Sequence, residues 1–358
     1  VGPVWCEGQE WAARRIAQAP QNGQNMAAAA DFFRTGPVCE NVGSGCANKA
    51  KEHAMPLTLT LLLACMTHAA PAGDLASLTD NFATPSGEFT SGPLWVWNDL
   101  LTTEQIETTL EALAAQNVRQ VWVHPRPGLM TPYLSEDWFA RWEDTLRMAK
   151  KLGMLAWIYD ENSYPSGFAG GYVPELMPES RGLGMRLEER KRVNLADPAI
   201  FAVYKKTADG YEELSREGGE KVEGEFLVAR IEETGTSPWF GGKFYVDLLR
   251  PGVTEKFLEV TMGAYKARFG DHFGGLVPGV FTDEPHLKPC GEFHWTPDLP
   301  EQFKLRWGAE LKDGLPHMKD DTAAGRLFRH NYFRTINELF MERWAKPYHD
   351  YCAEHNLE

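Results

Sequence analysis

Two adjacent acidic residues, Asp283 and Glu284, follow an apolar run that begins at Gly275, and they stand directly before Pro285. A buried parallel strand ends in this way, at a loop on the face of the sheet where ligands bind. A glutamate set among apolar and aromatic neighbours has its neutral form favoured, and a neutral carboxyl near pH 7 can act as a general acid. The sequence therefore predicts Glu284 as a catalytic acid. The structural alternative is that Asp283 caps the following helix and Glu284 forms a surface ion pair.

Three further predicted strands also end in polar or aromatic side chains. The first ends in Trp97 and Asn98, the second in His124 and Arg126, and the third in Asp160 and Glu161, with Tyr164 in the following loop. Because parallel strands deliver their carboxyl ends to one rim, we expect these residues to share a pocket with Asp283 and Glu284. We expect one of Trp95 and Trp97 in the core and the other free to stack on a ligand.

Each of these residues also has a structural interpretation. A lone histidine such as His124 is more often structural than catalytic. Asp160 or Glu161 could serve only to anchor Arg126. The stretch Tyr164-Pro-Ser-Gly167 is typical of a turn.

The elements that would position these residues alternate regularly. Strands are predicted at 94–97, 120–124 and 154–159, and helices begin at the capping box Thr102–Gln105 and at Ser135. This alternation is typical of a parallel sheet joined by right-handed crossovers. Residues 184–242 instead predict an antiparallel insertion, with its clearest strands at 200–206 and 225–231. The parallel pattern resumes with a strand at 244–247, a helix from Val253, the strand that leads to Glu284 and a long helix over 327–355.

The number of units suggests half of a larger fold. The four strands that end in these polar residues occupy, with four helices, residues 92–355, whereas a closed (β/α)8 TIM barrel needs eight such units. We therefore expect an α/β barrel of which only the first half is present. Residues 73–183 and 243–358 would form the incomplete barrel, and 184–242 the insertion. The alternative is a complete flavodoxin-like open sheet, but no Gly-rich phosphate loop follows the first strand.

The N-terminal segment has a different composition. Residues 1–54 are rich in Ala, Gln, Asn and Gly, and we expect an unstructured leader or mistranslated sequence. Residues 55–72 form an apolar run too short to span a bilayer, which is typical of a bacterial signal peptide. Ala70–Ala72 offers a cleavage site, and Leu62–Cys65 approximates a lipoprotein box in which Cys65 would carry a lipid anchor. We expect export to the periplasm, cell surface or medium without a membrane span. A buried helix is the alternative.

The charge of the chain narrows the class of partner. The formal net charge is -14, which disfavours nucleic acids and anionic membrane surfaces because both need a basic protein surface. A neutral substrate fits more easily. The 12 Trp and 11 Tyr residues suit stacking on sugar rings, and they equally suit an ordinary large core.

Five motifs together resemble one enzyme family. They are Trp95-Val-Trp-Asn98, His124-Pro-Arg-Pro-Gly128, Trp157-Ile-Tyr-Asp-Glu161, Tyr245-Val-Asp-Leu248 and Phe281-Thr-Asp-Glu-Pro285. They look like the catalytic barrel of glycoside hydrolase family 106, the α-L-rhamnosidase group. The resemblance implies a secreted bacterial enzyme that hydrolyses plant or polysaccharide glycosides with inversion, and a calcium ion in the sugar site. It maps Glu284 onto the general acid and places the partner base on a later strand, beyond residue 358.

On this interpretation the rim residues bind substrate. Trp97 would stack on a sugar, Asn98 and Arg126 would donate hydrogen bonds to hydroxyls, and Asp160 or Glu161 would bind hydroxyls or Ca²⁺. His124, Tyr164 and Asp283 would complete the site. A non-catalytic carbohydrate-binding fragment and a barrel glycosidase for another sugar remain alternatives. A metal-dependent barrel hydrolase is disfavoured, because the sequence has no His-x-His pair.

Overall fold

The computed structural model describes residues 79–82 and 85–358, which belong to one compact unit. The predictions for 1–54 and 55–72, including the lipid anchor at Cys65, lie outside the described residues. Within the described part of the chain, no helix is both long and apolar enough to cross a membrane.

The predicted parallel sheet is present. It consists of β1 (Leu94–Trp97), β2 (Gln120–Pro125), β3 (Leu155–Tyr159) and β8 (Val280–Phe281), in that spatial order, and every neighbouring pair is parallel. In this order the run before Asp283 pairs with the third strand. The fourth strand is only two residues long, so Asp283 and Glu284 lie in the loop beyond it.

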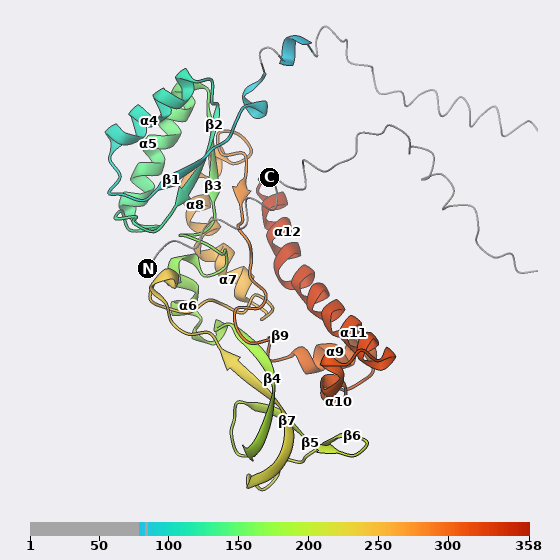
Figure 1. The fold of residues 1–358 in the computed structure, drawn as a ribbon. Helices are drawn as coiled ribbons and strands as arrows, with labels where there is room; N and C mark the ends of the chain where they lie inside the picture. The colour runs from blue at the N-terminus through green and yellow to red at the C-terminus, as the bar shows by residue number, and fades with distance from the viewer. Residues whose placement is uncertain (1–78, 83–84) are drawn as a thin grey trace, which may run out of the picture. The chain divides into compact units, whose positions relative to one another are not determined.

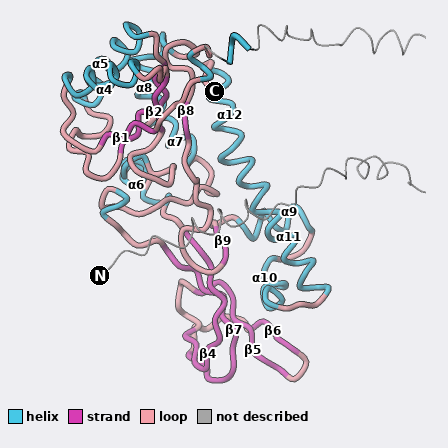
Figure 2. The backbone as a smooth tube through the Cα atoms, turned by 45° about the horizontal axis from the view of Figure 1, so that its top comes forward, coloured by secondary structure: helices cyan, strands magenta, loops and turns pink. Residues whose placement is uncertain are grey.

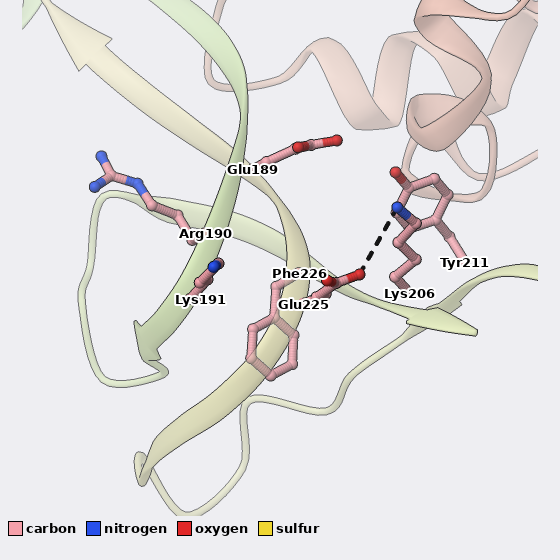
Figure 3. Close-up of a pocket in the computed structure, with 7 residues that line it drawn as sticks. All are labelled: Glu189, Arg190, Lys191, Lys206, Tyr211, Glu225 and Phe226. Atoms are coloured by element: carbon pink, nitrogen blue, oxygen red, sulfur yellow. Dashed lines mark ion pairs between the residues drawn. The ribbon is translucent and has the colours of Figure 1, made fainter. Parts of the chain in front are cut away.

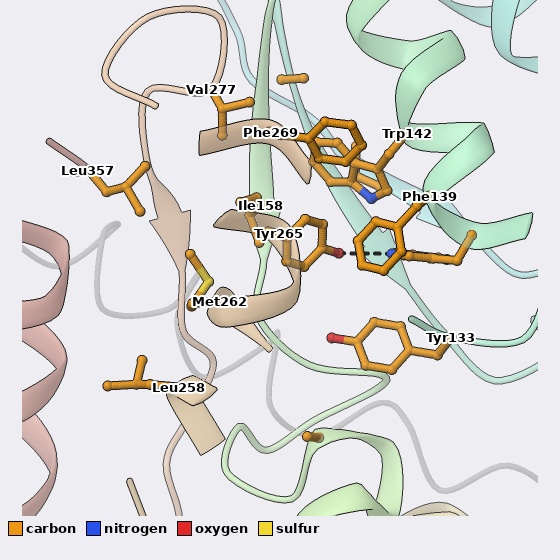
Figure 4. Close-up of a cluster of buried hydrophobic side chains, with 14 of the residues drawn as sticks. Tyr133, Phe139, Trp142, Ile158, Leu258, Met262, Tyr265, Phe269, Val277 and Leu357 are labelled. Atoms are coloured by element: carbon orange, nitrogen blue, oxygen red, sulfur yellow. Dashed lines mark hydrogen bonds between the residues drawn. The ribbon is translucent and has the colours of Figure 1, made fainter. Parts of the chain in front are cut away.

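Helices cover one face of this sheet. These are α4 (Thr103–Ala115), α5 (Glu136–Leu152) and α8 (Met262–Phe269), and Figure 1 shows α4 and α5 side by side against the strands. The capping box at Thr102 and Gln105 and the N-cap at Ser135 are confirmed, and Gly153 ends α5 in the left-handed region at φ 64°. In the core beneath, Trp138 Nε1 donates to the Tyr265 hydroxyl over 3.1 Å. Figure 4 shows Tyr265 beside Phe139 and Trp142.

Among the described residues, no helix packs on the apolar side chains of the opposite face of the parallel sheet. Leu94 is 48% exposed, Val96 44% and Phe281 36%, and the rings of Trp122 and Trp157 stack 4.2 Å apart between them. Four strands do not close on themselves, so the described residues contain an open sheet with an exposed apolar face. A closed barrel is not observed.

A second, antiparallel sheet follows β3 in the chain. Its strands, in the order β6-β5-β7-β4-β9, are β4 (Leu183–Asn194), β5 (Ile200–Thr207), β6 (Gly210–Glu213), β7 (Lys221–Glu233) and β9 (Phe293–Trp295). Figure 2 shows β4, β5 and β7 running together. The structure is therefore mixed α/β, with one parallel and one antiparallel sheet.

The strand predicted at 244–247 is wrong. Val246 makes only an isolated bridge to Arg181, and the Tyr245 carbonyl accepts hydrogen bonds from Gly182 N–H and the Thr234 hydroxyl. The edge of β3 pairs instead with β8. Residues 244–247 thus pack against the connections of the antiparallel sheet. β9, which lies in the stretch assigned to the barrel, joins that same sheet.

The remaining helices complete two cores. The predicted helix from Val253 is divided into α7 (Val253–Val260) and α8, and the long C-terminal helix comprises α11 (Ala323–Phe340), a π-helical turn (Met341–Ala345) and α12 (Lys346–Glu354). One core lies under the parallel sheet, and the other joins the antiparallel sheet to α9, α10 and α11. The other short elements are η1 (Gly87–Phe89), η2 (Ala169–Gly171), α6 (Tyr172–Leu176), η3 (Pro178–Ser180), η4 (Pro238–Phe240), η5 (Gly270–His272), α9 (Leu299–Trp307), α10 (Leu311–Gly314) and η6 (Leu315–Lys319).

Candidate functional site

Two side chains from neighbouring strands and one from the loop after β8 meet at the carboxyl edge of the parallel sheet. The rings of His124 on β2 and Tyr159 on β3 stack 3.7 Å apart, and the Tyr159 hydroxyl donates to Asp283 Oδ2 over 2.5 Å. Burial, together with the bond to Asp283, raises the pKa of Tyr159. The parallel topology therefore brings His124 and Asp283 to one edge, as expected from the strand order, and Tyr159 lies between them.

His124 is 2% exposed, and neither ring nitrogen has a hydrogen-bond partner among the described residues. Burial, and secondarily the charge of Arg126, lowers its pKa from 6.5 to about 4. The imidazole is therefore neutral at pH 7, with one donor and one acceptor unused.

Arg126 and Tyr164 lie beside this group. The guanidinium of Arg126 sits 5.0 Å from the centre of the Tyr164 ring, and its buried Nη1 has no partner among the described residues. Tyr164 is partly buried and packs edge-on against Trp239. Asn98 is exposed at the end of β1. Arg126 and Asn98 thus have polar groups that could form hydrogen bonds with the hydroxyls of a ligand.

Asp160 is fully buried, and both of its carboxylate oxygens are bonded. Ser166 donates to Oδ1 over 2.6 Å and the Tyr348 hydroxyl donates to Oδ2 over 2.7 Å. Burial raises the pKa of Asp160 to about 7, while the two hydroxyl donors oppose the shift. The contacts are to Ser166 and Tyr348 rather than to Arg126, so the anchoring role considered for Asp160 is not observed.

Glu161 is the centre of the loop that follows β3. Its Oε1 accepts the N–H groups of Asn162 and Gly170, and its Oε2 accepts those of Gly167, Phe168 and Ala169, over 2.5–3.1 Å. Ala169 and Gly170 are left-handed at φ 51° and 62°, which turns successive N–H groups toward one point. Such a backbone concavity binds an anion. Here the anion is the protein's own glutamate.

This arrangement corrects the role expected for Glu161. Both carboxylate oxygens of Glu161 are occupied by backbone N–H donors. Ca²⁺ binds to oxygen atoms, and these oxygens are not available to it. Glu161 therefore does not fit a calcium or sugar ligand. Burial, with Asp160 next to it, raises the pKa of Glu161, and the five N–H donors oppose that shift by stabilising the carboxylate. Among residues 79–82 and 85–358, no group of three or more His, Cys, Asp or Glu side chains could hold a metal ion.

Glu284 differs from expectation as well. Its side chain is exposed, and it has no hydrogen bond or ion pair within the described part of the chain. The burial expected to favour a neutral carboxyl is not seen in the described part of the chain, because Glu284 lies in the exposed loop that follows β8. The backbone of Glu284 is nevertheless left-handed at φ 43°. A non-glycine residue in this region is strained and persists only where its surroundings impose it.

Trp97 is not available for stacking on a sugar. It is 1% exposed and contacts Trp95, Trp138 and Trp142 with ring centres 5.0–6.3 Å apart. Trp95 and Trp97 are two residues apart in one strand, so both point to the helix-covered face. The division of roles expected between them is therefore wrong.

Two surface hollows differ in their position relative to the strand-end residues. A groove of about 550 Å³ runs between β8 and α12 and is lined by Thr282, Pro285, Trp344 and Tyr348 among others. It adjoins Asp283. A smaller hollow of about 250 Å³ lies on the antiparallel sheet, where Lys206 and Glu225 are 3.7 Å apart (Figure 3). It shares no residue with the strand-end group.

Sequence reasoning missed several residues of the site. Tyr159, Ser166, Tyr245 and Tyr348 all bond to the loops that carry Asp160 and Asp283. The alternation of β3 could have identified Tyr159, because it places Tyr159 on the same face as Trp157. No local signal marks Tyr348, which lies 188 residues from its partner Asp160.

Comparisons with known proteins give a distant fold relationship. No family model matches the chain, and no curated protein matches it. Among solved structures, a rhamnosidase from Novosphingobium sp. PP1Y aligns with a TM-score of 0.52 and 13% sequence identity. The alignment covers 78% of this chain and 46% of the rhamnosidase, so the chain spans less than half of that protein's length. The chain therefore shares the fold of part of a glycosidase.

Proposed function

We propose that this chain forms part of the catalytic domain of a glycoside hydrolase, with α-L-rhamnosides as the first substrates to test. The observation that carries the proposal is the convergence of His124, Tyr159 and Asp283 at the carboxyl ends of consecutive parallel strands, with Glu284 next in the chain. Ligands bind at this edge in parallel α/β folds. The fold likeness to a rhamnosidase supports the choice of substrate class.

The proposal includes a larger barrel around this sheet. The exposed side chains Leu94, Val96 and Phe281 lie on the helix-free face, which is the inner face of a (β/α)8 barrel. An apolar sheet face open to water is a liability that proteins normally cover. Further strands would cover this face and would enclose Glu284.

In this mechanism Glu284 donates a proton to the departing glycosidic oxygen, and a second carboxylate activates water. Inversion requires the two carboxyl groups to stand about 6.5–9.5 Å apart. Asp160 and Glu161 are committed to hydrogen bonds, so neither is assigned as the base. Neutral His124 and Nη1 of Arg126, which lack hydrogen-bond partners among the described residues, would bond to sugar hydroxyls.

A non-catalytic carbohydrate-binding role is the second candidate, because Glu284 is exposed. It predicts sugar binding without turnover. The deciding experiment incubates the longest natural form of the protein with 4-nitrophenyl α-L-rhamnoside and a panel of other 4-nitrophenyl glycosides. Release of nitrophenol supports the proposal if NMR shows that the first-formed sugar anomer has the inverted configuration. Retention of configuration would contradict the mechanism, and binding without release would favour the second candidate.

Calcium and export are separate proposals. Loss of activity in EDTA and its recovery with Ca²⁺ would support a calcium site, which would have to use ligands other than Glu161. Export through residues 55–72 is tested by sequencing the N-terminus of the protein recovered from its host, since a cleaved signal leaves a new N-terminus near Gly73.

A further inference from the structure

Ser166 connects the loops after β3 and β8. It is fully buried, and its hydroxyl donates to Asp160 Oδ1 over 2.6 Å while accepting the N–H of Asp283 over 2.8 Å. The N–H of Ser166 donates in turn to the Asp283 carbonyl over 2.8 Å. Both backbone polar groups of Asp283 are therefore held by one serine.

A second anchor lies three residues further along. The Tyr245 hydroxyl donates to the Ser166 carbonyl over 2.7 Å and accepts the N–H of His286 over 3.0 Å. Glu284 and Pro285 are the only residues between the two anchored N–H groups. The side chain of Glu284 has no partner among the described residues, so its strained backbone at φ 43° is not imposed by its own side chain.

We propose that Ser166, oriented by Asp160, is the positioning residue that fixes the backbone of Asp283–His286 and so aims the Glu284 carboxyl. The catalytic part of this inference rests on the proposed function. Asp160 acts through Ser166 and does not touch substrate. Its second oxygen is occupied by Tyr348 of α12, which ties the C-terminal helix to the same group.

The consequence for catalysis follows from geometry. A proton donor must lie within hydrogen-bond reach of the leaving oxygen, and a displacement of about 1 Å can cost about 10²-fold in rate. Without Ser166 the strained segment would relax toward ordinary backbone angles and carry Glu284 with it. Substrate binding by other rim residues would be affected less, so kcat would fall while KM changes little.

The first test uses hydrogen exchange and needs no activity. Ser166→Ala removes the acceptor of the Asp283 N–H, so exchange in peptide 280–287 should speed up about tenfold relative to peptide 120–125 of β2, as expected for one lost hydrogen bond. Tyr245→Phe, which removes the acceptor of the His286 N–H, should accelerate the same peptide. Ser163→Ala is the matched control, because Ser163 lies in the same loop, is 4% exposed and has no partner for its hydroxyl among the described residues.

The second test measures catalysis in the longest natural form of the protein. Ser166→Ala should lower kcat for the best glycoside by about 10–100-fold with KM within about threefold, and Ser163→Ala should leave both near wild type. The positioning role is overturned if the exchange rate of peptide 280–287 rises no more in Ser166→Ala than in Ser163→Ala. It is also overturned if this rate rises only as much as that of peptide 120–125 in β2. A wild-type protein with no hydrolase activity refutes the proposed function instead, and the exchange comparison still decides the role of Ser166.

Discussion

The substitution Glu161→Gln tests how the loop after β3 is held. Glutamine keeps one carbonyl oxygen, which can replace Oε2 and accept the three N–H groups bonded there. Its amide nitrogen then faces the N–H groups of Asn162 and Gly170, which lose their acceptor. A buried donor left without an acceptor costs about 1–3 kcal/mol. Two such donors predict a loss of about 2–6 kcal/mol, a large part of the ~5–15 kcal/mol that stabilises a typical domain.

Urea unfolding followed by tryptophan fluorescence measures this loss as a shift of the midpoint at constant m-value. Glu179→Gln is the matched control, because Glu179 is exposed and has no hydrogen bond or ion pair among the described residues, and it should change stability by less than about 0.5 kcal/mol. A Glu161→Gln protein within about 1 kcal/mol of wild type would refute the view that this carboxylate organises the loop. If Ca²⁺ stabilises the wild type and does not stabilise Glu161→Gln, Glu161 is a metal ligand after all.

Three further outcomes are expected. Glu284→Gln should reduce glycoside turnover by about 10²–10⁴-fold, and turnover within threefold of wild type would remove Glu284 as the acid. Because burial lowers the pKa of His124 to about 4, the folded state binds this proton less readily than the unfolded state, so stability is lost as the pH falls from 6.5 toward 4. Wild type should therefore lose about 3 kcal/mol more than His124→Gln between pH 7 and pH 4, and parallel urea-midpoint profiles would contradict this. Trp97→Ala should cost about 3–5 kcal/mol of stability, and sugar affinity measured by calorimetry on the folded variant should stay within about twofold of wild type; a larger loss of affinity would return Trp97 to the sugar site.

Local sequence patterns predicted the elements that local interactions control. The capping box at Thr102 and the N-cap at Ser135 were found because a side chain bonds to a backbone N–H three residues away. The strands at 94–97 and 154–159 were found from short apolar runs. The segment at 244–247 has a similar pattern but is not a strand of the sheet, because strand pairing depends on which edge is free in the folded chain.

The rim was predicted from the same local patterns, but the role of each residue was not. Asp160, Glu161 and Asp283 look alike in sequence, as carboxylates after strands. In the structure Asp160 is bonded to two hydroxyls, Glu161 to five backbone N–H groups and Asp283 to the Tyr159 hydroxyl. Burial and partners separate their roles, and both depend on residues distant in the chain.

The sequence by itself determined that parallel strands alternate with helices and that their polar ends share one edge, because side-chain periodicity and helix caps act within a few residues. Only the tertiary structure decided that Trp97 is core, that Glu161 binds its own loop and that Ser166 holds Asp283. The last of these joins residues 117 positions apart, and a contact of that range exists only once the sheet has formed.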